Sequence, residues 1–107
     1  MQIQMNFANI ESSDALESHV RQQLDSSIGR FNDRLTRIEV HLADDNSPHK
    51  NGQFDKRCTL EARPRGGDPI TVEAKAAEFY PAINDATRKL QSALTSRLDR
   101  PVDRTSV

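Results

Sequence analysis

Apolar and polar residues alternate along four short segments of the chain, as in strands that are buried on one face. In the first segment Ile3, Met5 and Phe7 share one side, and the intervening side chains are polar. The four segments are residues 2–7, 37–43, 57–63 and 70–76. Because successive side chains of a strand point to opposite faces of a sheet, each segment predicts a half-buried strand.

Two longer segments have the helical period instead. The first follows Ser12 and Ser13, and either hydroxyl can cap a helix by accepting a hydrogen bond from an unpaired backbone amide. Spacings of three and four then put its apolar residues on one helical face, and Gly29 is consistent with termination nearby. These apolar residues are Leu16, Val20, Leu24, Ile28 and Phe31.

A second helix is predicted to begin near Glu78 or Phe79, with Pro81 in its first turn. Its apolar stripe runs from Ile83 through Leu90 to Leu98. Pro101 follows and ends it, because proline cannot continue the backbone hydrogen-bond pattern.

The resulting order is β-α-β-β-β-α, which predicts an α+β fold. Every strand is polar on one face and each helix has one apolar stripe. We therefore expect a four-stranded mixed sheet with both helices packed on one face and the other face wet. A helical crossover makes the first two strands parallel, and antiparallel hairpins join the rest. Residues 1–100 form one domain, residues 44–53 a turn-rich loop and residues 101–107 a mobile tail.

Composition limits the choice of partner. The chain has 107 residues, enough for one domain, with 35% hydrophobic and 29% charged residues. Fifteen Lys and Arg against sixteen Asp and Glu give a formal net charge of −1. Because nonspecific nucleic-acid binding usually needs a basic excess, an RNA-binding surface here has to be a local patch.

Cysteine usage and hydropathy indicate a cytoplasmic protein. Cys58 is the only cysteine, so it cannot form an intrachain disulfide. The first ten residues lack the basic and apolar regions of a signal peptide. The longest apolar run is far shorter than a membrane span, so we expect no membrane contact.

No residue pattern predicts catalysis. Cys58 falls on the inward side of a strand, and nothing in the sequence brings His19, His41 and His49 together. Metal-ligand spacings and glycine-rich phosphate loops are missing as well. We therefore expect no enzyme activity, no metal, no cofactor and no small-molecule substrate, although a small enzyme using His41 or Cys58 is one alternative.

Basic residues are the remaining candidates for function. The second helix carries Arg88, Lys89, Arg97 and Arg100, and Arg30 lies at the end of the first. Such side chains could neutralise RNA phosphates, and arginine offers a planar fork for two-point contacts. Acidic residues are interspersed among them, so the charges by themselves favour an ordinary solvated surface over RNA binding.

Aromatic residues do not indicate base stacking on the sheet. The outward strand positions hold polar and charged side chains, and Tyr80 is expected to be partly exposed at the start of the second helix. Readers of single-stranded RNA place aromatic rings on an exposed sheet. RNA contacts are therefore expected at phosphates.

Three stretches resemble the ribosome hibernation-promoting and ribosome-associated translation-inhibitor proteins, also called sigma-54 modulation proteins. They are MQIQMNFANIESSDAL at the start, GRFNDRLTRIEVHL after the first helix, and VEAKAAEFYPAINDATRKLQSAL near the end. The resemblance covers residues 1 to about 98 and rests on the ordered set of stretches, not on any one of them.

The resemblance implies a protein that binds the small ribosomal subunit in the channel for messenger and transfer RNA and blocks initiation. It implies ribosomal RNA contacts from basic residues on the two helices. The matching positions are Arg30, Arg88, Lys89 and Arg97. A protein-binding adaptor that kept the fold and lost ribosome affinity is the main alternative, and a monomer is the expected state.

Overall fold

The computed structural model describes residues 1–45 and 54–99. Its elements are β1 (Gln2–Ala8), α1 (Asp14–Ile28), the 3₁₀ turn η1 (Gly29–Arg34), β2 (Leu35–Asp44), β3 (Lys56–Pro64), β4 (Ile70–Ala76) and α2 (Phe79–Leu98). The predicted order of strands and helices is therefore confirmed. Most of the predicted loop at 44–53, and the whole predicted tail at 101–107, lie outside the described residues.

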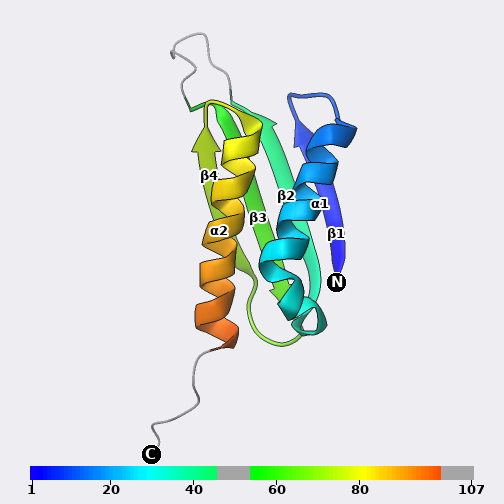
Figure 1. Cartoon of the computed structure of the whole chain (residues 1–107), viewed down its shortest axis with the longest axis vertical. Helices are drawn as coiled ribbons and strands as arrows, with labels where there is room; N and C mark the ends of the chain where they lie inside the picture. Colours follow the sequence, from blue (N-terminus) through cyan, green and yellow to red (C-terminus); the bar gives the residue numbers. More distant parts are fainter. Residues whose placement is uncertain (46–53, 100–107) are drawn as a thin grey trace, which may run out of the picture.

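The sheet has the order β1-β2-β3-β4, so β1 and β4 are its edges. β1 pairs with β2 in parallel, and the other two pairings are antiparallel. Both helices lie on one face of this sheet, side by side and with their N-termini at the same end (Figure 1). The predicted two-layer, mixed-sheet architecture is confirmed.

Ser13, and not Ser12, caps α1. Its backbone is extended, and its Oγ accepts a hydrogen bond from the amide of Leu16 at 3.2 Å. The helix ends at Ile28, with Gly29 as its C-cap, which agrees with the predicted termination.

The sequence pattern missed the turn that follows α1. Residues Gly29–Arg34 form a 3₁₀ helix, so Phe31 is buried from this turn and not from an extension of α1. The strand that follows begins at Leu35, two residues earlier than the alternation predicts, because an irregularity in its pairing between Leu35 and Arg37 interrupts the period of two. Leu35 itself is fully buried.

One apolar core fills the space between the sheet and the helices. Fully buried members come from α1, β2, β3 and α2: Val20, Leu24, Ile28, Ile38, Val40, Leu42, Leu60, Ile83, Leu90 and Leu94. Each contributes about 1.5–3 kcal/mol through the apolar surface it removes from water. The residues of β1 that face this layer are only partly buried, because β1 lies at the margin of the sheet.

Candidate functional site

An open groove runs between α2 and the edge strand β4. Its volume is about 610 Å³, and it is lined by Ala74, Lys75, Asp85, Arg88, Lys89, Ser92, Ala93 and Ser96. Three of these side chains are basic and one is acidic. The groove therefore carries a net positive charge in a chain whose formal net charge is −1.

The apolar stripe of α2 determines where these basic residues lie. Leu90 and Leu94 are fully buried against the sheet, so the neighbouring Lys89 falls on the flank of the helix. From there its Nζ donates a hydrogen bond to the backbone carbonyl of Glu73 in β4, at 2.8 Å. Lys75 lies on the same edge strand and is exposed.

Arg88 and Arg97 lie at different places along the same helix. Arg88 forms an ion pair with Asp85, one turn earlier, and its side chain is 69% exposed. Arg97 lies two turns beyond Lys89 and donates to the backbone carbonyl of Asp68, just before β4, at 3.1 Å. Lys89 and Arg97 thus both reach the β4 side of α2, and the groove brings Arg88 and Lys89 together.

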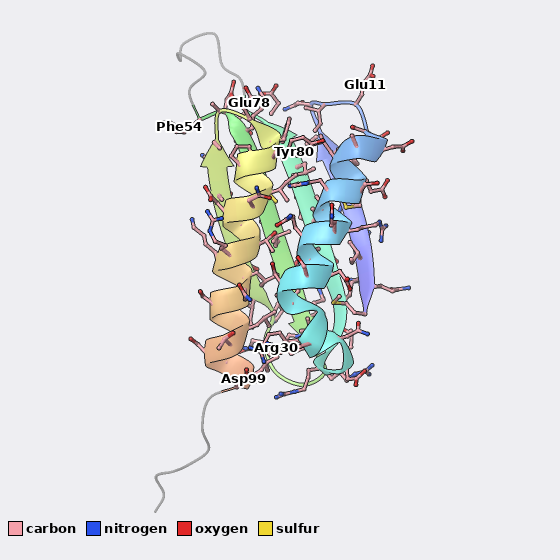
Figure 2. The ribbon with its side chains drawn as sticks, in the orientation of Figure 1. Glu11, Arg30, Phe54, Glu78, Tyr80 and Asp99 are labelled. Carbon is pink, nitrogen blue, oxygen red and sulfur yellow. The ribbon has the colours of Figure 1, made fainter. Side chains whose placement is uncertain are left out.

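Arg30 is separate from this groove. It belongs to the 3₁₀ turn after α1, and Figure 2 shows it beside Asp99 at the C-terminal ends of the two helices. Its guanidinium donates to Asp99 Oδ2 at 2.5 Å and to Thr95 Oγ1 at 3.2 Å, and it also lies 4.2 Å from the centre of the Phe31 ring. Of the four expected residues, Arg88 and Lys89 therefore line one groove, and Arg97 lies farther along α2 against Asp68. Arg30 lies at the seam between the helices.

Lys75 is the groove residue that sequence reasoning missed. It appears in the sequence only as an outward position of the last strand, where it resembles any solvated lysine. The strand order makes it significant, because β4 is an edge and α2 packs along it. The sequence could have indicated Lys75 only through a combination of features, namely a lysine on an edge strand that is followed by a basic helix.

The face of the sheet opposite the helices is charged but balanced. Register places Arg37 opposite Arg63 and Glu39 opposite Glu61 on neighbouring strands. Glu39 lies 2.8 Å from Arg37 and 3.7 Å from Arg63, and Glu61 lies 3.4 Å from Arg63. Each of these two arginines therefore has an acidic partner within the same face.

The residues considered for catalysis are not assembled into a site. Cys58 is fully buried, and this burial raises the pKa of its thiol to about 12, so the reactive thiolate is scarce. His41 lies 3.7 Å from Glu39 on the wet face of the sheet, whereas His19 bonds to Asn84 between the helices. His49 lies outside the described residues.

The described part of the chain contains neither a metal-ligand cluster nor a helix that could span a membrane. Within residues 1–45 and 54–99, no group of three His, Cys, Asp or Glu side chains is placed to hold a metal ion. Neither described helix is long and apolar enough to cross a membrane.

Solved structures show the same fold. A ribosomal subunit interface protein from Coxiella burnetii matches with a TM-score of 0.77 and 20% identity, over 94% of this chain and 100% of that one. The N-terminal domain of Protein Y from Thermus thermophilus matches with a TM-score of 0.72 and 24% identity, over 91% and 99% of the two chains. No curated protein matches the sequence significantly.

By its fold and its surface, the protein is a small two-layer α+β domain whose described residues present a basic groove. Its sequence also matches the family model "Sigma 54 modulation protein / S30EA ribosomal protein" over residues 3–101. The chain belongs to this family, which is one of ribosome-associated factors and not of enzymes. The resemblance stated from the sequence is therefore confirmed.

Proposed function

We propose that this protein binds the small ribosomal subunit and inhibits translation by occupying the channel used by messenger and transfer RNA. The observation that supports the proposal is the α2–β4 groove, which is lined by Lys75, Arg88 and Lys89 in a chain that belongs to this family. Ribosomal RNA offers phosphates that such a groove can neutralise. The compact body would then exclude other RNA by its volume, with no chemical step and in the cytoplasm, where ribosomes work.

The chain has a formal net charge of −1, but its charges are arranged so that the α2–β4 groove is basic. Arg97 extends the groove's basic residues along α2, and the wet sheet face is balanced by its own ion pairs. Attraction to RNA is therefore directional: it favours approach from the α2–β4 side. Arg30 supplies a weaker contact at the end of the helices, because Asp99 already offsets its charge.

The proposal predicts how much the affinity for RNA falls as the salt concentration rises. Each phosphate neutralised on a single strand contributes about 0.7 to the slope of log affinity against log salt concentration. Four contacts, from Lys75, Arg88, Lys89 and Arg97, predict an affinity loss of roughly 50-fold between 50 and 200 mM salt. Binding through an apolar protein interface would change far less over this range.

The test is co-sedimentation of the purified protein with small ribosomal subunits across a salt series, with and without competing messenger or transfer RNA. A variant with Arg88, Lys89 and Arg97 all replaced by Glu should lose binding while keeping its thermal unfolding midpoint close to that of the wild type. Arg21→Glu is the control, because Arg21 is an exposed residue of α1 paired with Glu17.

The outcomes separate the function from the site. If the wild type fails to sediment with subunits even at low salt, ribosome binding is wrong. If the triple variant binds as well as the wild type, ribosome binding stands and the groove is the wrong surface. Loss of binding in Arg21→Glu alone would place the interface on α1.

A protein-binding adaptor remains the second candidate, and one observation favours it. Each expected basic residue already has an intramolecular partner: Arg30 has Asp99, Arg88 has Asp85, and Lys89 and Arg97 have backbone carbonyls. Such contacts lower the gain from meeting a phosphate. Capture of a protein partner with an affinity insensitive to salt, together with no subunit binding, would support the adaptor.

A further inference from the structure

Tyr80 is unusually exposed for an aromatic residue at the junction of two packed helices. It lies in the first turn of α2, is 46% exposed, and projects on the helix side of the molecule beside α1 (Figure 2). Among the described residues the only other large apolar side chain with comparable exposure is Phe54, which lies next to the undescribed segment 46–53.

A second ring holds Tyr80 in place. The His19 ring of α1 lies with its centroid 4.4 Å from that of Tyr80, tilted by 54°. His19 is itself fixed, because its Nε2 lies 2.8 Å from Oδ1 of Asn84 on α2. The two rings are therefore positioned from both helices, and an exposed aromatic surface of this kind needs little reordering on binding a flat ligand.

The aromatic pair is connected to the basic groove along one stripe of α2. Tyr80, Asn84 and Arg88 are spaced by four residues, so they lie on successive turns of α2. Because each step of four also rotates around the helix, this stripe winds from the α1 side, where Asn84 bonds to His19, toward the groove that Arg88 lines. At 1.5 Å per residue the distance along the helix from Tyr80 to Arg88 is roughly 12 Å. A short strand of RNA can thus lie over Tyr80 while its phosphates reach Arg88 and the groove.

The charges near Tyr80 suit a base better than a phosphate. Glu78 caps α2 two residues earlier without a side-chain hydrogen bond, and Glu11 is exposed at the same end of the molecule (Figure 2). These carboxylates repel phosphate, whereas an uncharged, flat nucleobase can stack on a tyrosine ring. Asn84 adds an amide that can meet a base edge.

We propose that Tyr80, supported by His19, is a stacking platform for one unpaired nucleobase of the RNA strand whose phosphates the α2–β4 groove binds. The proposal rests on the proposed function and adds a base contact to an interface that the sequence predicts to touch phosphates alone. It makes the protein prefer single-stranded RNA over duplex RNA, because paired bases are not available for stacking on a protein ring.

The chain contains one tyrosine and no tryptophan, so its intrinsic fluorescence reports on Tyr80 directly. The experiment titrates the full chain with a short single-stranded RNA oligonucleotide, following tyrosine fluorescence and, in parallel, the anisotropy of a label on the RNA. A matched oligonucleotide with abasic sites is the control, since it keeps the phosphates and lacks the bases. Stacking predicts quenching by the first oligonucleotide and none by the second.

Two substitutions complete the test. Tyr80→Phe keeps an aromatic ring and should bind the RNA as well as the wild type. Tyr80→Ala should lose roughly 5- to 150-fold in affinity, which corresponds to the free energy of one stacked base. Should Tyr80→Ala unfold, the quenching experiment on the wild type still decides. His19→Ala should weaken binding less than Tyr80→Ala, because His19 only positions the ring.

The possible failures are distinct. Binding seen by anisotropy without quenching, or equal affinity for the abasic oligonucleotide, overturns the stacking platform and leaves the groove intact. Quenching that persists in the variant with Arg88, Lys89 and Arg97 replaced would keep the platform and overturn the groove. If neither signal appears but the protein sediments with subunits, the platform is wrong and ribosome binding stands.

Discussion

Lys89 on α2 donates a hydrogen bond from Nζ to the backbone carbonyl of Glu73 in β4, at 2.8 Å. β4 is an edge strand, and edges expose unpaired backbone groups that can pair with other chains. One lysine therefore covers part of this edge and also lines the basic groove. The contact relates stability to function, since an RNA phosphate that takes Lys89 would free the edge carbonyl to water.

Lys75 provides the sharpest test of the groove, because sequence reasoning did not select it. Lys75→Gln should lower affinity for single-stranded RNA about fivefold near 0.1 M salt and reduce the salt slope by about 0.7. Anisotropy titrations at several salt concentrations measure both quantities. Arg21→Gln removes the same charge from α1 and should leave them unchanged; equal losses in the two variants would mean that only net charge matters.

Arg30 should matter less than the groove lysines. Its guanidinium is paired with Asp99, so Arg30→Gln removes a charge that is already largely offset. We expect a smaller loss of RNA affinity than Lys89→Gln produces, and a change in unfolding free energy below about 1 kcal/mol because the pair is exposed. The same titrations and urea unfolding measure these effects. A loss larger than that of Lys89→Gln would show that Arg30 leaves Asp99 to contact RNA.

Capping of α1 should depend on Ser13 alone. Ser13→Ala removes the acceptor for the Leu16 amide and should lower the free energy of unfolding by about 1 kcal/mol. Ser12→Ala is the matched control on the neighbouring residue and should change it by less than about 0.5 kcal/mol. Urea denaturation followed by circular dichroism compares the two, and a larger cost for Ser12→Ala would contradict the capping assignment.

Cys58 should be inert in the folded protein and should affect its alkaline stability. Burial raises the pKa of its thiol from 9.0 to about 12, so the unfolded chain loses this proton at lower pH than the folded chain. The contribution to stability is therefore intact below about pH 9 and declines as the pH rises toward 12. Thiol labelling at pH 8 should require denaturant. Between pH 8 and 10.5 the free energy of unfolding, measured with urea, should fall less in Cys58→Ala than in the wild type. Rapid labelling of the native protein would show that the thiol is accessible.

The repeating patterns predicted the helices and strands well, but they did not predict the segments with irregular backbone. Leu24 and Leu90 belong to helical stripes, and Val40 and Leu60 to alternating strands, and all four are fully buried as expected. The 3₁₀ turn at Gly29–Arg34 went unrecognised, because it continues the apolar spacing of α1 through Phe31. The pairing irregularity near Leu35 likewise hides the start of β2 from a rule based on strict alternation.

The candidate site was predictable only in part, for a different reason. Arg88 and Lys89 are adjacent in the chain, so one helix face brings them together without any tertiary information. Lys75 lies in the same groove because α2 packs along an edge strand. Arg30 lies elsewhere, because the turn after α1 places it beside Asp99. Both outcomes depend on contacts between segments far apart in the sequence.

The sequence by itself determined the fold class, the topology of a two-layer domain and most of the core, because burial of apolar faces follows from local periodicity. Only the tertiary structure decided which charged side chains share a surface, which are already paired, and that Tyr80 lies against His19. Periodicity specifies the direction of a side chain relative to its own element. The neighbours that a side chain meets depend on how the elements pack, and periodicity does not encode that packing.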